Sequence, residues 1–149
     1  MSQWKSKNKV HWVTSLSLIY LALIIATVTI LHHTQVIGWI YAILVIVWPL
    51  PVAWVYCRKC TCRLDCGHII LGLLTRLMPQ KKCDKYTLTE IILMIIPVVA
   101  VFVIPQFWLW QEKFYFATFW ILSGIAGIEV LFFVCQKCSN EHCPMNKKS

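Results

Sequence analysis

The chain has 149 residues, of which 59% are hydrophobic and only 13% are charged. This composition excludes an ordinary soluble domain. The formal net charge of +8 would suggest nucleic-acid binding in a soluble protein. Here the basic residues flank apolar segments, as in membrane proteins, so we expect no nucleic-acid partner.

Four apolar segments follow one another along the chain, each about 20 residues long. A helix of this length crosses the roughly 30 Å of hydrocarbon in a bilayer. The sequence therefore predicts an all-α integral membrane protein with four transmembrane helices in two hairpins, forming a single membrane domain over residues 1–149. The predicted helices span residues 12–31, 36–56, 88–110 and 114–134.

The basic residues are distributed unevenly between the two sides of these helices. Thirteen of the 14 Lys and Arg residues lie before the first segment, between the second and third, or after the fourth, whereas Lys113 lies on the other side. Cytoplasmic flanks of membrane helices are enriched in Lys and Arg. We therefore expect both termini and the loop over residues 57–87 in the cytoplasm, with the basic surface against membrane lipid.

The loop and the helices carry further local signals. Residues 67–78 are apolar but too short to span a bilayer, which predicts a short interfacial helix ended by Pro79. Thr87 and Glu90 have capping-box spacing at the start of the third helix, which favours a structural role for Glu90. Kinks are predicted at prolines in the second and third helices. These prolines are Pro49, Pro51, Pro97 and Pro105.

All eight cysteines lie in the loop and in the tail over residues 135–149. The first cluster comprises Cys57, Cys60, Cys62 and Cys66 with Cys83, and the second comprises Cys135, Cys138 and Cys143. Thiols this dense beside membrane segments predict a cysteine-rich cytoplasmic cap formed by the loop and the tail. A reducing compartment disfavours disulfides between them, and thiol redox catalysis lacks a thioredoxin-like context.

Two kinds of metal site compete for these cysteines. Structural zinc is commonly bound by two Cys-x2-Cys pairs, a spacing found at Cys57/Cys60 and at Cys135/Cys138. Iron–sulfur clusters need several closely spaced thiolates, and the Cys143-Pro144 ending is typical of ferredoxin-type segments, which favours two 4Fe–4S clusters. The expected ligand sets are Cys57, Cys60, Cys62, Cys66 and Cys83, Cys135, Cys138, Cys143. Alternative ligands are His68 and His142.

The segment Cys62-Arg-Leu-Asp-Cys66-Gly-His-Ile-Ile-Leu-Gly-Leu-Leu, just past a membrane helix, resembles a segment of membrane-bound polyferredoxin-like proteins of the quinol dehydrogenase type. The tail from Cys135 to Pro144 is similar to the ferredoxin-like part of that family, although Gly67 stands where the family has proline. The resemblance implies electron transfer between quinone and redox partners at a bacterial or archaeal cytoplasmic membrane. The ligands it implies are Cys62, Cys66, Cys135, Cys138 and Cys143.

Glu129 is an acidic residue inside the last apolar segment, about two turns before Cys135. A carboxylate in hydrocarbon is costly unless it faces the helix bundle, is protonated or pairs with a basic group. Glu129 is therefore a candidate for proton transfer to quinone, with a hydrogen bond to another helix as the structural alternative.

Together these signals predict a small subunit of a membrane redox or respiratory complex that transfers electrons through iron–sulfur clusters. A chain with so little material outside the membrane leaves substrate conversion to other subunits, and no hydrolase or transferase motif is present. The alternative is a non-catalytic membrane anchor or scaffold subunit whose cysteine-rich cap is stiffened by zinc.

Overall fold

The computed structural model describes residues 2–55, 57–59, 79 and 86–134. Helices joined by short turns make up nearly all of this part of the chain, which contains no strand. The α-helices are α1 (Ser2–His33), α2 (Gln35–Val47), α3 (Pro49–Val55), α5 (Leu88–Val103), α6 (Gln106–Leu109) and α7 (Lys113–Glu129). A 3₁₀ turn, η1 (Cys57–Lys59), follows α3, and a π-helical turn, η2 (Val130–Val134), follows α7.

Four helical stretches in the described residues are long and apolar enough to cross a membrane. They are Val13–His33, Gln35–Val55, Leu88–Leu109 and Lys113–Phe133, each of 21 or 22 residues. The second combines α2 with α3, and the third combines α5 with α6. The prediction of an all-α protein with four membrane helices is confirmed, whereas the expected cysteine-rich cap and its interfacial helix lie outside the described residues.

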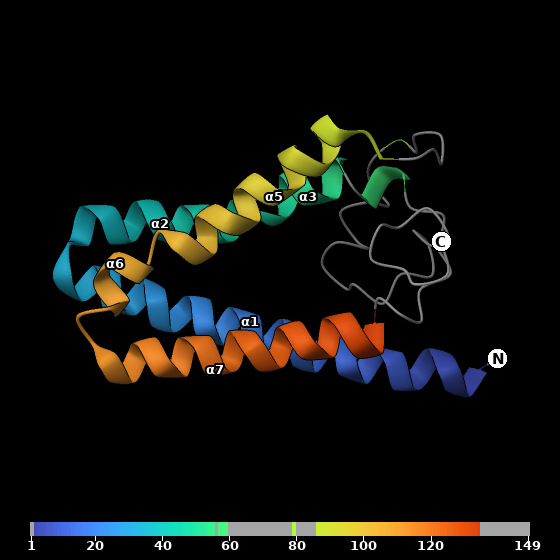
Figure 1. Cartoon of the computed structure of the whole chain (residues 1–149), viewed down its shortest axis with the longest axis horizontal. Coiled ribbons are helices and arrows are strands. Elements are labelled where there is room, and N and C mark those ends of the chain that lie inside the picture. Colours follow the sequence, from blue (N-terminus) through green and yellow to red (C-terminus); the bar gives the residue numbers. More distant parts are fainter. Residues whose placement is uncertain (1, 56, 60–78, 80–85, 135–149) are drawn as a thin grey trace.

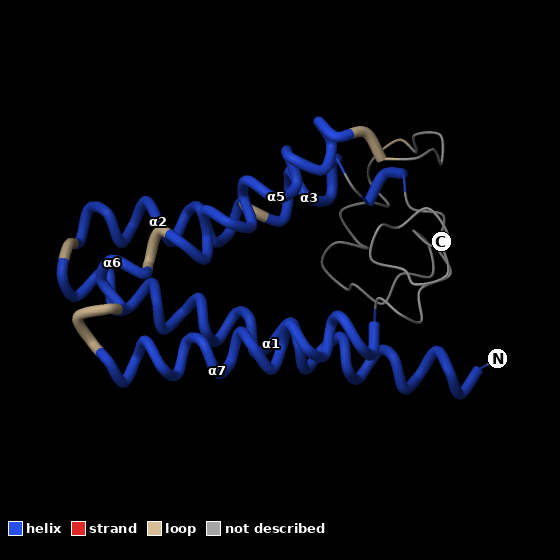
Figure 2. The backbone as a smooth tube through the Cα atoms, viewed as in Figure 1, coloured by secondary structure: helices blue, strands red, loops and turns tan. Residues whose placement is uncertain are grey.

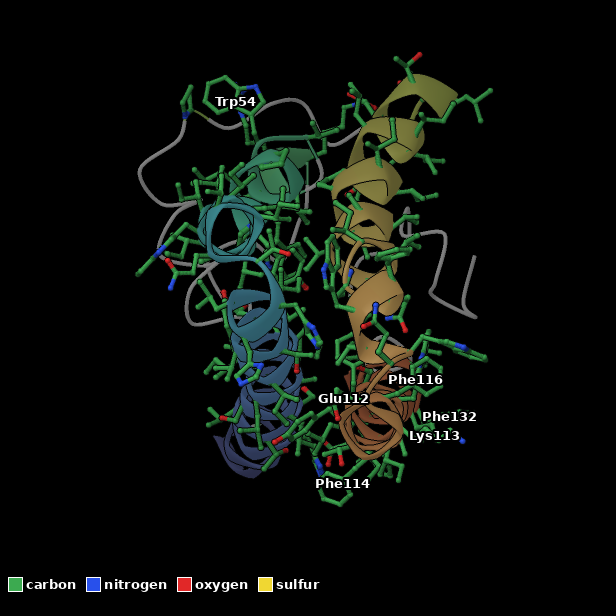
Figure 3. The ribbon with its side chains drawn as sticks, turned by 90° about the vertical axis from the view of Figure 1, so that its left-hand side faces the viewer. Trp54, Glu112, Lys113, Phe114, Phe116 and Phe132 are labelled. Carbon is green, nitrogen blue, oxygen red and sulfur yellow. The ribbon has the colours of Figure 1, made fainter. Side chains whose placement is uncertain are left out.

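The four spans are arranged as two antiparallel pairs. α1 packs against α7, and α3 packs against α5, while α2 connects the pairs by lying on α1 (Figure 1). Seen along the bundle, α1 and α7 lie side by side below α2 and α5 (Figure 3). The two pairs meet at one end of the bundle and diverge towards the other (Figures 1 and 2).

The two ends of the bundle differ in what they carry. α1 begins, α3 ends, α5 begins and η2 ends at the same end (Figure 1). We call this the cysteine end, because the chain runs from it into both cysteine clusters. The opposite turn end carries short connections at Thr34 and at residues 110–112 (Figure 2), with Glu112 and Lys113 exposed there (Figure 3).

The core lies where α1 meets α2, α6 and α7, and Val101 of α5 also packs into it. Ala22 and Ala26 of α1 are fully buried, and so is Phe119 of α7. Small residues one turn apart let helices approach closely in membranes. The outward faces are apolar too, as at Val36 and Phe107, which are 71% and 73% exposed. Such surfaces suit contact with lipid rather than water.

Two of the four membrane prolines coincide with breaks in the helices. α2 and α3 are separated at Trp48, next to Pro49, and α5 and α6 are separated at Ile104 and Pro105. α5 continues through Pro97. A proline leaves the carbonyl four residues earlier without its helical donor. For Pro105 that carbonyl belongs to Val101.

Side chains from other helices stabilise the break at Pro105. The buried Tyr41 hydroxyl of α2 donates a hydrogen bond to the Val101 carbonyl at 2.7 Å. The Gln106 amide donates to the Phe102 carbonyl at 2.6 Å and accepts from the Trp120 indole of α7 at 3.1 Å. The break is thus fixed to both neighbouring helices, as expected for a proline inside a membrane bundle.

The turn between α1 and α2 requires glycine at position 38. The turn consists of Thr34 alone, and the Gly38 N–H donates to the Thr34 carbonyl at 2.9 Å. A Cβ atom on Gly38 would lie 2.6 Å from the Leu31 side chain and 2.8 Å from its Cα. The backbone contact cannot be relieved by turning a side chain, so the two helices would have to move apart.

We expect Gly38→Ala to lower the free energy of unfolding by about 1 kcal/mol through overpacking. Gly124→Ala is the matched control, because a Cβ atom there meets nothing within 4 Å. That control should be neutral or more stable by up to about 1 kcal/mol, since alanine favours a helix over glycine. Unfolding of both variants in one detergent checks this, and equal stabilities would contradict the tight turn.

Candidate functional site

Both cysteine clusters are attached at the same end of the bundle. Cys57 opens η1 after α3, and Cys135 is the next residue after Val134, which ends η2 (Figure 1). All predicted ligands except Cys57 lie outside the described residues. They are Cys60, Cys62, Cys66, Cys83, Cys135, Cys138 and Cys143, with the alternatives His68 and His142. Among the described residues, no three His, Cys, Asp or Glu side chains come together as a metal site.

The first cysteine segment begins in a turn held by Arg58. The Arg58 guanidinium lies 4.4 Å from the ring centroid of Trp54, and its Nε donates to the Pro79 carbonyl at 2.9 Å. Trp54 is itself 55% exposed and lies at the edge of the bundle (Figure 3). An exposed tryptophan near a helix end is typical of the membrane interface. The cation–π contact with Trp54 therefore holds η1 at the level of the membrane interface.

Lys59 connects η1 to the start of α5. Its Nζ donates to Glu90 Oε2 at 2.6 Å, and only 7% of the residue is exposed. The ammonium also lies 5.8 Å from the ring centroid of Tyr86. A charge buried this deeply requires a partner of opposite sign. The pair holds the segment between Cys57 and Cys60 against α5.

Glu90 makes the capping box that its spacing predicts. Glu90 Oε2 accepts from the Thr87 N–H at 3.0 Å, and the Thr87 hydroxyl accepts from the Glu90 N–H at 3.4 Å. The same carboxylate oxygen accepts from Lys59. Sequence reasoning found the cap but missed the ion pair, because 31 residues separate the two partners.

Glu129 lies at the junction of α7 and η2 and faces α1. Its Oε2 accepts from the Thr14 hydroxyl at 3.1 Å, and its Oε1 lies 4.0 Å from His11 Nδ1. Phe133, four residues after Glu129, stacks on the His11 ring at 4.9 Å between centroids. Glu129 therefore faces α1 within the bundle, with the Thr14 hydroxyl at hydrogen-bond distance and the His11 ring beside it.

The α1 partners of Glu129 were missed in the sequence, although a signal for them exists. His11 and Thr14 are three residues apart and so lie on one helix face. The Ser15 hydroxyl on the same face donates to the His11 carbonyl at 2.8 Å. A polar face at the start of an apolar segment could have been matched with the acidic residue near the end of the last segment, since the predicted topology brings both to the same end.

Two of the polar contacts of the described residues join helical elements at the cysteine end. One ties η1 to α5 through Lys59 and Glu90, and the other ties α1 to α7 through His11, Thr14 and Glu129. Each contact adjoins a cysteine cluster in the sequence. No protein-family model, no curated protein and no solved structure matches this chain.

Proposed function

We propose that this chain is a small subunit of a membrane redox complex, with iron–sulfur clusters bound by its two cysteine segments. The observation that supports this most is that Cys57 and Cys135 adjoin helices ending at the same end of the bundle. Two segments attached at one end can combine their thiols in one cap. Segments attached at opposite ends of a membrane could not.

The chemistry of the donor set fits such clusters. Two 4Fe–4S clusters require about eight thiolates, which is the number of cysteines in the chain. The proposed sets are Cys57, Cys60, Cys62, Cys66 and Cys83, Cys135, Cys138, Cys143. When bound, the clusters supply one-electron transfer.

Basic residues of the chain would anchor this cap and balance the negative charge of its thiolates. Arg58 and Lys59 follow Cys57 directly, and their contacts with Trp54 and Glu90 fix the start of the first segment. Positive charge next to cysteines favours the thiolate form, which is the form that binds metal. Thirteen of the 14 Lys and Arg residues lie on this side, which favours a cytoplasmic cap under the positive-inside rule.

The proposed partners follow from how little of the chain lies outside the membrane. The turn-end connections are a single residue at Thr34 and residues 110–112. Substrate conversion would therefore belong to other subunits, with electrons passing between them and this cap. Quinone, which is dissolved in the same membrane, is the candidate small-molecule partner.

A zinc-stiffened anchor subunit is the second candidate. The Cys-x2-Cys spacing at Cys57/Cys60 and at Cys135/Cys138 is that of zinc-binding pairs, and both pairs adjoin the same end of the bundle. Four ligands would then suffice, and the remaining cysteines would be free thiols.

Metal analysis of the full chain, purified anaerobically in detergent, distinguishes the two candidates. The proposed function predicts about eight iron atoms per chain and a broad visible absorption that bleaches on reduction. Colourless protein with stoichiometric zinc would reject electron transfer through this chain and support the anchor function. Protein without either metal would contradict both.

We expect Cys57→Ser and Cys135→Ser each to lower the iron content by about half, because each removes one ligand from a different cluster. Thr61→Ala and Ser139→Ala are matched controls, since they lie in the same segments and keep all thiols. Retention of iron by both cysteine variants would contradict the proposed ligand sets. Loss of zinc instead of iron would assign the same cysteines to a structural site.

A further inference from the structure

The contact between α1 and the end of α7 has the composition of a proton-binding site. It combines a carboxylate, an imidazole and a hydroxyl, and it lies next to an apolar ring. Glu129 is only 23% exposed at its side chain, whereas His11 is 40% exposed. Ionisable groups within membrane spans are costly and mark functional positions.

The backbone at this position is also unusual. α7 changes into the π-helical turn η2 directly after Glu129. π-helical turns are rare and occur frequently at functional sites. Here the turn follows Glu129 and carries Phe133 against His11, while Phe132 projects outward (Figure 3). Glu129 and Phe133 thereby meet the same α1 side chain.

We propose that His11, Thr14 and Glu129 form a proton-exchange site at the cysteine end, in which Glu129 takes up and releases the proton. In the ionised state the Thr14 hydroxyl donates to Glu129 Oε2 across 3.1 Å. When Glu129 binds a proton, its new O–H donates to Thr14 Oγ1. The Thr14 hydroxyl then turns to the His11 carbonyl oxygen, which lies 3.0 Å away.

The Thr14 hydroxyl therefore satisfies both protonation states of Glu129. A hydroxyl can donate one hydrogen bond and accept others, and its proton rotates freely between acceptors. Uptake adds one proton and no electron, so the exchange needs no co-reactant and does not depend on metal binding.

Few titratable side chains lie around Glu129 among the described residues. α1 brings His11, whose Nδ1 is 4.0 Å from the carboxylate, and η2 brings no titratable side chain. α6, which also packs on α7, consists of Gln106–Leu109 and has no titratable side chain either. Among the described side chains, His11 is therefore the titratable group shown to lie closest to Glu129.

Infrared spectroscopy of the full chain in lipid nanodiscs, recorded over a range of pH, tests the site. The proposal predicts one component of the carboxylic-acid C=O absorption that appears as the pH falls and is lost in Glu129→Gln, whereas the other five of the six acidic residues keep theirs. Glu112→Gln is the matched control, because Glu112 is an exposed carboxylate at the turn end, and it should keep this band. Equal spectra for the native chain and Glu129→Gln would overturn the proposal.

Variants of the α1 partners separate proton exchange from a merely structural contact. Thr14→Val should shift the frequency of the Glu129 band, and Thr14→Ser, which keeps the hydroxyl, should restore it. His11→Phe keeps a ring to stack on Phe133 but removes Nδ1, which lies 4.0 Å from the carboxylate, so it should also alter the Glu129 band. A band that neither Thr14→Val nor His11→Phe alters would show that Glu129 titrates outside this site and would overturn the proposal.

Discussion

Replacing Lys59 by methionine is expected to lower the free energy of unfolding by about 3–5 kcal/mol, because it removes the ammonium that balances the charge of the mostly buried Glu90 carboxylate. The side chains of Lys59 and Glu90 are only 6% and 14% exposed, and their charged atoms are 2.6 Å apart. Exposed pairs are worth about 0–1 kcal/mol. We expect the larger value here because the side chains of both Lys59 and Glu90 are mostly buried.

A double variant separates the lost charge from the lost packing. Glu90→Gln keeps the capping box, since glutamine at this helix position also accepts from the Thr87 N–H. We expect the Lys59→Met/Glu90→Gln pair to be more stable than Lys59→Met alone, because no unpaired charge remains. Lys113→Met, at an exposed position of the turn end, is the control for removing a lysine.

Denaturant or thermal unfolding in a single detergent, followed by circular dichroism, measures all four proteins. A Lys59→Met variant no less stable than Lys113→Met would show that the pair contributes nothing. The same variants probe the cap, since Lys59 lies between Cys57 and Cys60 in the sequence. Under the proposed function, Lys59→Met should also lower the iron content, whereas the outer Lys113→Met should not.

The number of membrane helices could be predicted because it depends on length and hydrophobicity alone. About 20 apolar residues are needed to cross a bilayer, and four such stretches are present in the structure. The capping box at Thr87 and Glu90 was equally predictable, since its partners lie within one helical turn. Both features are local, so one segment of sequence contains all the information.

The partners of Lys59 and Glu129 could not be predicted in the same way. Glu129 and Thr14 are 115 residues apart, and their contact depends on how α1 and α7 are rotated about their axes. Apolar faces turned to lipid and to neighbouring helices look alike in the sequence, because lipid is as apolar as a leucine side chain. Nothing in hydropathy therefore indicates the rotation of a membrane helix.

The breaks in the helices were only partly predictable, for a related reason. Pro105 ends α5, whereas Pro97 lies within α5. A proline removes one hydrogen bond in either case. Whether the helix breaks depends on which side chains of other helices reach the freed carbonyl, and the sequence does not show them. The ligand arrangement of the cysteines lies outside the described residues and stays a prediction.

Tyr41→Phe is expected to lower the free energy of unfolding by about 1–3 kcal/mol, because it leaves a buried carbonyl without a donor. The Tyr41 hydroxyl donates to Val101 at 2.7 Å, and only 1% of the tyrosine is exposed. Side-chain hydrogen bonds in membrane proteins average about 0.6 kcal/mol, since alternative partners are often found. Here Pro105 has removed the natural alternative, so we expect a larger effect.

Pro105→Ala provides the test of that reasoning. Alanine at this position has an N–H that can donate to the Val101 carbonyl, and the backbone there is already in the helical region, with φ −70° and ψ −15°. The loss caused by Tyr41→Phe should therefore shrink by half or more in the Pro105→Ala background. Unfolding of the four proteins of this cycle measures the coupling. An equal loss in both backgrounds would mean that Tyr41 stabilises the bundle by packing alone, and that Pro105 does not determine the need for its hydroxyl.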